Sequence, residues 1–133
     1  MKEYFITSGD DFDVGPNIDE LHTIMRAAIP VPGEKWMRTW LMHIADGEDW
    51  HAHEHNGYVA VYYVEVGTPA AALWINGVRR EPTVGEIIVI PPLTTHYVET
   101  NNSGGVRKSY SMQVHHNDEA NIMRSPEKVW RNY

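Results

Sequence analysis

Residues 47–67 read Gly-Glu-Asp-Trp-His-Ala-His-Glu-His-Asn-Gly-Tyr-Val-Ala-Val-Tyr-Tyr-Val-Glu-Val-Gly, and this stretch is the strongest indication of both architecture and chemistry. It places three histidines, His51, His53 and His55, at every second position. Successive side chains of a β-strand point to opposite faces, so the three imidazoles of a regular strand would share one side. Imidazole is the commonest protein ligand of transition metals. The run therefore predicts a metal site on a strand.

A further histidine, His96, follows the segment Pro91-Pro92-Leu93-Thr94-Thr95 much later in the chain. A β-barrel can bring such distant segments onto neighbouring strands, so His96 can join the cluster. Cysteine is absent, which restricts the ligands of a transition metal to His, carboxylate, Tyr or water. We expect one divalent ion (Fe, Mn, Ni, Zn or Cu), because affinity alone does not select among these metals.

The segments after Gly33 indicate a mostly β chain, since turn residues separate short runs rich in Val, Ile, Tyr and Trp at intervals of about 8 to 12 residues. Asn76-Gly77 predicts a tight hairpin turn, because both residues accept positive φ. The predicted strands are the His segment and residues 36–44, 58–66, 71–75, 86–90, 95–100 and 106–115.

Two helical segments flank the predicted strands. Residues 17–28 form the first, with Asn17 as its N-cap and with an apolar stripe at 3.6-residue spacing. The segment from Asp118 to Trp130 has a break at Pro126 and predicts one or two short helical turns. The stripe of the first helix consists of Ile18, Leu21, Ile24, Met25 and Ala28.

Two motifs in this order resemble those of the cupin superfamily. The first cupin motif is a Gly, five residues, His-x-His, three or four residues, a Glu, six residues and a Gly. Gly47, His53, His55 and Gly67 match it. The Glu position falls on Val59 or Ala60, so the carboxylate ligand is missing.

The second cupin motif is a Gly, five residues, Pro-x-Gly, two residues, a His, three residues and an Asn. Gly85, Pro91 and His96 match it at the same spacing. Leu93 stands where the second Gly is usual, and Thr100 stands where the Asn is usual, with Asn101 one position later. The resemblance covers residues 37–115 and concerns small single-domain cupins.

The resemblance implies an all-β fold, the cupin double-stranded β-helix (jelly-roll barrel), with a short N-terminal helix and a small C-terminal helical segment. Residues 1–133 would form a single domain with a barrel core over residues 36–116. His53, His55 and His96 would be the metal ligands, and three neutral imidazoles would leave a divalent ion its full +2 charge. Strand alternation makes His51 a candidate fourth ligand.

A metal-bound water or substrate needs a proton partner, and the candidate catalytic residues are Tyr62, Tyr110, His43 and Gln113. Alternation divides residues 106–115 into one set with Tyr110 and another with Gln113, and either set could face the barrel interior. The same holds for residues 36–44, where the face that carries Trp36, Trp40 and Met42 lies opposite the face that carries His43.

Two functions fit these features. The first is a metal-dependent cupin enzyme acting on a small organic molecule, as a dioxygenase or as a non-redox lyase, isomerase or cyclase. The second is a non-catalytic cupin that binds a sugar or an organic acid, with a structural metal or none. One fold hosts many chemistries, so the resemblance does not choose between them.

Charge and hydropathy restrict the partners. Eleven Lys and Arg against 18 Asp and Glu give a net charge of −7, whereas proteins that bind nucleic acid usually carry a positively charged surface. No apolar run reaches the length of a membrane span or a signal-peptide core. We expect a cytoplasmic protein that binds a small molecule but neither nucleic acid nor membrane. Edge strands and several tryptophans also predict a homodimer.

Overall fold

Two nine-residue strands, β2 (Trp36–Ile44) and β9 (Arg107–His115), form the centre of the larger of two sheets. They pair antiparallel along their whole length, from Trp36 opposite His115 to Ile44 opposite Arg107. β2 is mostly apolar, whereas β9 alternates apolar with polar residues, with Tyr110, Met112 and Val114 on one face and Ser109, Ser111 and Gln113 on the other.

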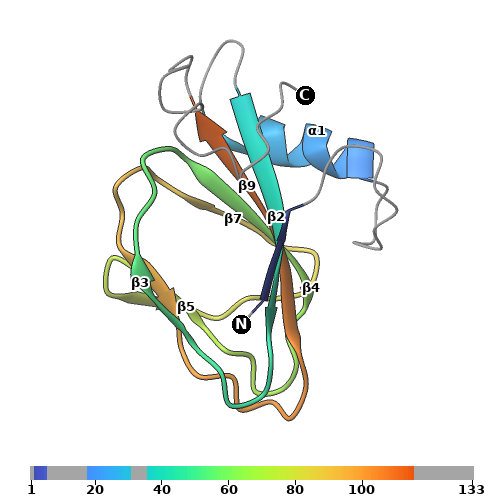
Figure 1. Cartoon of the computed structure of the whole chain (residues 1–133), viewed down its shortest axis with the longest axis vertical. Helices are drawn as coiled ribbons and strands as arrows, with labels where there is room; N and C mark the ends of the chain where they lie inside the picture. Colours follow the sequence, from blue (N-terminus) through green and yellow to red (C-terminus); the bar gives the residue numbers. More distant parts are fainter. Residues whose placement is uncertain (1, 6–17, 31–35, 116–133) are drawn as a thin grey trace.

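The computed structural model describes residues 2–5, 18–30 and 36–115. Within this part of the chain, the strands form two antiparallel sheets with the orders β1-β2-β9-β4-β7 and β3-β8-β5-β6. Figure 1 shows the sheets as opposite walls of a barrel, with α1 outside it. The remaining elements are β1 (Lys2–Phe5), α1 (Ile18–Ala28), β3 (Trp50–His53), β4 (Val59–Glu65), β5 (Leu73–Ile75), β6 (Val78–Arg80), β7 (Ile87–Ile90) and β8 (His96–Val98).

The predicted all-β architecture is confirmed. Every strand predicted between residues 36 and 115 is present, with ends within two residues of the prediction. Asn76 and Gly77 take φ values of 48° and 79° and join β5 to β6, as a two-residue hairpin of the favoured type requires. β1 and β6 were not predicted, because each is short. The predicted cap Asn17 and the segment 118–130 lie outside the described residues.

The larger sheet has two buried faces, and strand alternation assigns each side chain to one of them. Its outer face packs against α1, so the sheet itself separates the helix from the barrel interior. The sequence left open which set of β9 side chains faces the barrel interior, and the position of α1 decides it. Tyr110 belongs to the outer set, whereas Ser109 and Ser111 face the interior. The helix-side core contains Ile18, Leu21, Met25, Ile29, Met37, Leu41, Ala60, Tyr110, Met112 and Val114.

One polar residue belongs to the buried face of α1. His22 is 3% exposed, whereas Ile24 of the predicted apolar stripe is 44% exposed. His22 Nε2 lies 2.6 Å from the Tyr110 hydroxyl, so helix and sheet share a buried hydrogen bond. Burial lowers the pKa of His22 to about 4, although Asp19 opposes this shift. The imidazole is therefore neutral in the folded protein at neutral pH.

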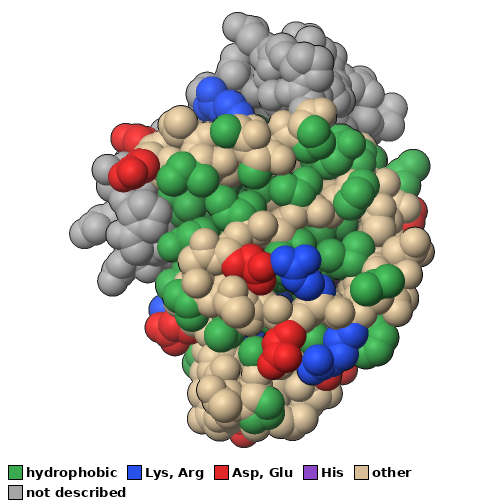
Figure 2. Space-filling model, turned by 180° about the vertical axis from the view of Figure 1, so that it is seen from behind, with side chains coloured by type: hydrophobic (Ala, Val, Ile, Leu, Met, Phe, Trp, Pro, Cys, Tyr) green, Lys and Arg blue, Asp and Glu red, His purple; other side chains and the backbone are tan. Residues whose placement is uncertain are grey.

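The surface of the smaller sheet carries ion pairs. Arg79 Nε lies 3.0 Å from Glu99 Oε1, and Arg80 Nη2 lies 2.6 Å from Glu86 Oε2. Figure 2 shows the back of the molecule, where acidic and basic side chains lie next to one another. Such exposed pairs add little stability. Among the described residues, no helix is long and apolar enough to cross a membrane.

The low pKa of His22 predicts acid sensitivity. Because the unfolded chain takes up a proton near pH 6.5 and the folded chain only near pH 4, stability should fall as pH drops through this window. The loss attributable to His22 should be on the order of 3 kcal/mol. Urea unfolding at a series of pH values should show a shallower pH dependence for His22→Gln than for wild type. The exposed His51→Gln serves as the matched control, and equal slopes for both variants would contradict the prediction.

Candidate metal centre

Three imidazoles converge between the two sheets. His53 ends β3 and pairs with His96, the first residue of β8, while His55 lies two residues beyond β3. Their nearest ligand nitrogens all lie within 4.8 Å of one another. The ring centroids of His53 and His96 are 4.2 Å apart, and those of His53 and His55 are 4.9 Å apart. The fold thus assembles the three histidines that the motifs single out.

Backbone carbonyls orient two of these rings. His53 Nδ1 lies 2.9 Å from the carbonyl oxygen of His51, and His96 Nδ1 lies 2.9 Å from that of Thr94. A carbonyl only accepts hydrogen bonds, so each Nδ1 carries the proton and donates it. Nε2 then carries the lone pair, as in metal-ligating histidines whose other nitrogen is held by a backbone carbonyl. The donor set fits a divalent transition metal.

The protonation state of His96 also favours metal binding. Its side chain is buried, and burial is the main reason why its pKa is lowered. The hydrogen bond to Thr94 opposes this shift, whereas nearby His53 adds to it. A neutral imidazole is the form that binds metal, so protons compete weakly at this position.

The structure does not group His51 with the other three histidines. A register irregularity falls between Trp50 and His53, and both of these side chains line the cavity although they are three residues apart. His51 and Ala52 are exposed. The expected fourth ligand assumed regular alternation, and a β-bulge breaks that alternation. His51 contributes its carbonyl to His53 instead of its ring to the cluster.

Two backbone features position His55. The amide of Leu93 donates a 2.7 Å hydrogen bond to the carbonyl of His55. Leu93 itself has a φ of 54°, so it adopts the left-handed backbone that a glycine supplies in the second cupin motif, at a cost of about 1–2 kcal/mol. Gly57 passes so close to β9 that an added Cβ would lie 2.0 Å from the Val114 carbonyl oxygen.

The position of the missing cupin Glu is apolar. Val59 is buried and lines the cavity, while Ala60 packs on the helix side of the sheet. No Asp or Glu of the described residues lines the cavity. A divalent ion held by His53, His55 and His96 would therefore keep its full +2 charge.

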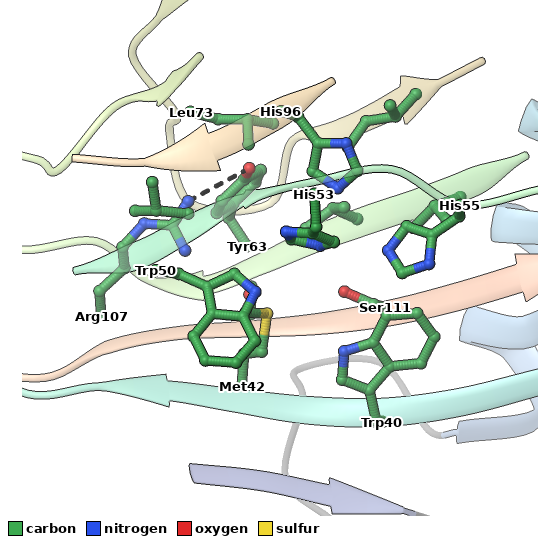
Figure 3. A pocket seen from close by; sticks show the side chains of 15 residues that line it. Trp40, Met42, Trp50, His53, His55, Tyr63, Leu73, His96, Arg107 and Ser111 are labelled. Carbon is green, nitrogen blue, oxygen red and sulfur yellow. Dashed lines mark hydrogen bonds between the residues drawn. The ribbon is translucent and has the colours of Figure 1, made fainter. Parts of the chain in front are cut away.

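The histidine cluster borders a cavity of about 420 Å³, counting its open mouth. Figure 3 shows the three histidines on one side of it and Trp40 and Trp50 on another. Most of the wall is apolar. Polar groups come from β4 and β9, namely Tyr63, Arg107, Ser109 and Ser111. We did not predict Arg107 from the sequence, although it shares the alternation of Ser109 and Ser111.

Three of the four predicted catalytic residues lie away from the cavity. Tyr62 and Tyr110 pack in the helix-side core, and His43 falls on that same outer face of β2 by alternation from Leu41. The sheet separates all three from the histidine cluster. Their predicted role as proton partners therefore has no support in the geometry.

Gln113, the fourth candidate, lies on the interior side of β9 but does not line the cavity. Its Oε1 accepts a 2.8 Å hydrogen bond from Arg38 Nε, and its Nε2 donates a 3.2 Å hydrogen bond to Asn56 Oδ1. Both ends of the amide are engaged, one with buried Arg38 and one with exposed Asn56, so Gln113 is a structural group at the edge of the barrel.

Comparison with known proteins supports the fold. No family profile and no curated protein sequence matches this chain. Among solved structures, an RmlC-like cupin from Methanocaldococcus jannaschii with a double-stranded β-helix fold is similar at a TM-score of 0.54 and 17% identity, covering 68% of this chain and 80% of the other. The chain therefore has the cupin fold.

Two similar structures are enzymes. Salicylate 1,2-dioxygenase from Pseudoaminobacter salicylatoxidans, in complex with gentisate, is 13% identical with a TM-score of 0.52, covering 72% of this chain and 24% of that one. DMSP lyase from Ruegeria pomeroyi is 12% identical with a TM-score of 0.53, covering 62% of this chain and 40% of that one. At these identities the likeness concerns the fold alone.

The geometry predicts which histidines a metal needs. His53→Ala and His96→Ala should each weaken Zn²⁺ binding at least 100-fold, because each removes one of three ligand nitrogens. His51→Ala should leave the affinity within about threefold of wild type, since its ring lies outside the cluster. Calorimetric titration of metal-depleted, tag-free protein measures the Zn²⁺ affinity, and elemental analysis measures the metal content. Loss of stoichiometric metal from His51→Ala, or its retention by His96→Ala, would contradict the assignment.

Proposed function

We propose that the protein is a metal-dependent enzyme that acts on a small organic molecule, with His53, His55 and His96 holding one divalent metal. The observation that carries this proposal is the convergence of three imidazoles on one cavity, two of them with Nδ1 hydrogen-bonded to a backbone carbonyl. Three protein ligands leave coordination positions for substrate or water, as in catalytic rather than structural metal sites.

The side chains around the cavity favour oxygenation over proton abstraction. Besides the three histidines, its titratable residues are Tyr63 and Arg107, and no carboxylate base is present among the described lining residues. A bound divalent metal supplies Lewis acidity and, where it is redox-active, oxygen chemistry. The chain itself excludes water through its apolar wall and flanks the substrate with Trp40 and Trp50. We therefore place a dioxygenase first and a non-redox lyase, isomerase or cyclase second.

Oxygen consumption distinguishes these reactions. Metal-depleted protein is reloaded separately with Fe²⁺, Mn²⁺, Ni²⁺ or Zn²⁺ and offered salicylate, gentisate and dimethylsulfoniopropionate, while an oxygen electrode and product chromatography follow the reaction. We expect oxygen uptake with the Fe²⁺ or Mn²⁺ protein on an aromatic acid, its loss in His96→Ala and its retention in His51→Ala.

The other outcomes of this experiment are equally informative. Product formation without oxygen uptake, supported by Zn²⁺ as well as Fe²⁺, would replace the dioxygenase with a non-redox reaction. Stoichiometric metal without turnover of any compound would count against an enzyme of these substrate classes and favour a binding protein.

A further inference from the structure

Arg107 is a buried cation that has no anionic partner among the described residues. Its side chain is 1% exposed and lines the cavity. Nε donates a 3.1 Å hydrogen bond to the carbonyl of Ala71, and Nη2 donates a 3.4 Å hydrogen bond to the hydroxyl of Tyr63. Nη1 has no acceptor, and the guanidinium has no ion pair among the described residues.

Tyr63 does not neutralise this charge. The guanidinium carbon lies 5.0 Å from the centre of the Tyr63 ring, and the Tyr63 hydroxyl accepts a hydrogen bond from Nη2. Burial raises the pKa of Tyr63, so the phenol stays neutral at neutral pH. A guanidinium removed from water and left without an anion is strongly unfavourable, which is why buried charges in proteins are normally paired.

Two further donors on the same cavity wall lack acceptors. Ser109 Oγ and Trp40 Nε1 are buried and make no hydrogen bond with the described residues. Ser109 follows Arg107 by two positions on β9, so their side chains leave the same face of the strand. Buried donors are almost always satisfied, and three unsatisfied donors around one cavity indicate a ligand rich in acceptor atoms.

We propose that Arg107, assisted by Ser109, binds the carboxylate of a small organic acid in this cavity. Guanidinium and carboxylate match as a planar, two-point pair, and the apolar walls suit an organic remainder. Arg107 and the three histidines line the same cavity (Figure 3), so an acid held by Arg107 directs its organic remainder into the space that the histidine cluster borders. The inference deepens the proposed function by naming the substrate class of that site.

Binding of a charged probe and its neutral counterpart tests this inference without any metal. Calorimetry on metal-depleted protein compares benzoate with benzamide, which has the same ring but no charge. We expect benzoate to bind at least tenfold more tightly, and Arg107→Met to weaken benzoate at least tenfold and benzamide less, because only benzoate loses a charge pair. The control Arg79→Met removes an exposed arginine and should change neither affinity.

Equal binding of the two probes by wild type, or undiminished benzoate binding by folded Arg107→Met, would overturn the inference. Near-UV circular dichroism establishes folding of each variant. Should Arg107→Met fail to fold, Ser109→Ala decides, because it removes the donor next to Arg107 and should weaken benzoate binding at least threefold. Unchanged benzoate affinity in Ser109→Ala would equally overturn the inference.

Metal content and benzoate binding are measured separately, so the proposed enzyme and the carboxylate site can each fail without the other. Elemental analysis of the wild-type protein measures the metal, and calorimetry of the metal-depleted protein measures the preference for benzoate. A protein that binds benzoate through Arg107 but holds no metal would refute only the proposed enzyme. A protein that holds metal but shows no preference for benzoate would refute only the carboxylate site.

Discussion

The larger sheet is buried on both faces, and the alternation of its side chains is the constraint on which the rest of the molecule depends. One face forms a core with α1, and the other forms the wall of the cavity. A one-residue slip of β9 would exchange the two sets, placing Tyr110 in the cavity and turning Arg107 to the outer face. Pairing of β9 with both β2 and β4, together with the helix-side core, holds the register. The site therefore depends on contacts made on the opposite face of the sheet.

The electrostatics of the cavity differ from those of the surface. The chain as a whole carries a net charge of −7, yet the titratable groups among the described cavity residues are three histidines, one tyrosine and one arginine. Low dielectric strengthens each interaction there, so a single buried guanidinium acts more strongly on a ligand than an exposed one. The acidic balance of the chain thus stops at the cavity, where the described lining residues include a guanidinium and no carboxylate.

The sequence predicted the fold and the three-histidine cluster because both are encoded in spacing. Gly47, Gly67 and Gly85 all take positive φ at the turns where the motifs place them. Other features depend on tertiary packing. Alternation divides Tyr110 from Ser109, but only the position of α1 determines which of them faces outward. His22 interrupts an apolar stripe, and its burial follows from a partner 88 residues away. An unpaired buried charge such as Arg107 leaves no pattern in a single sequence.

The bulge between Trp50 and His53 makes this part of the chain tolerant of changes in composition. Its two intervening side chains, at His51 and Ala52, are exposed, so many amino acids fit there. Position 51 supplies its backbone carbonyl to His53 Nδ1, and every amino acid has that carbonyl. Replacements at these two positions should therefore leave the orientation of the His53 ring unchanged.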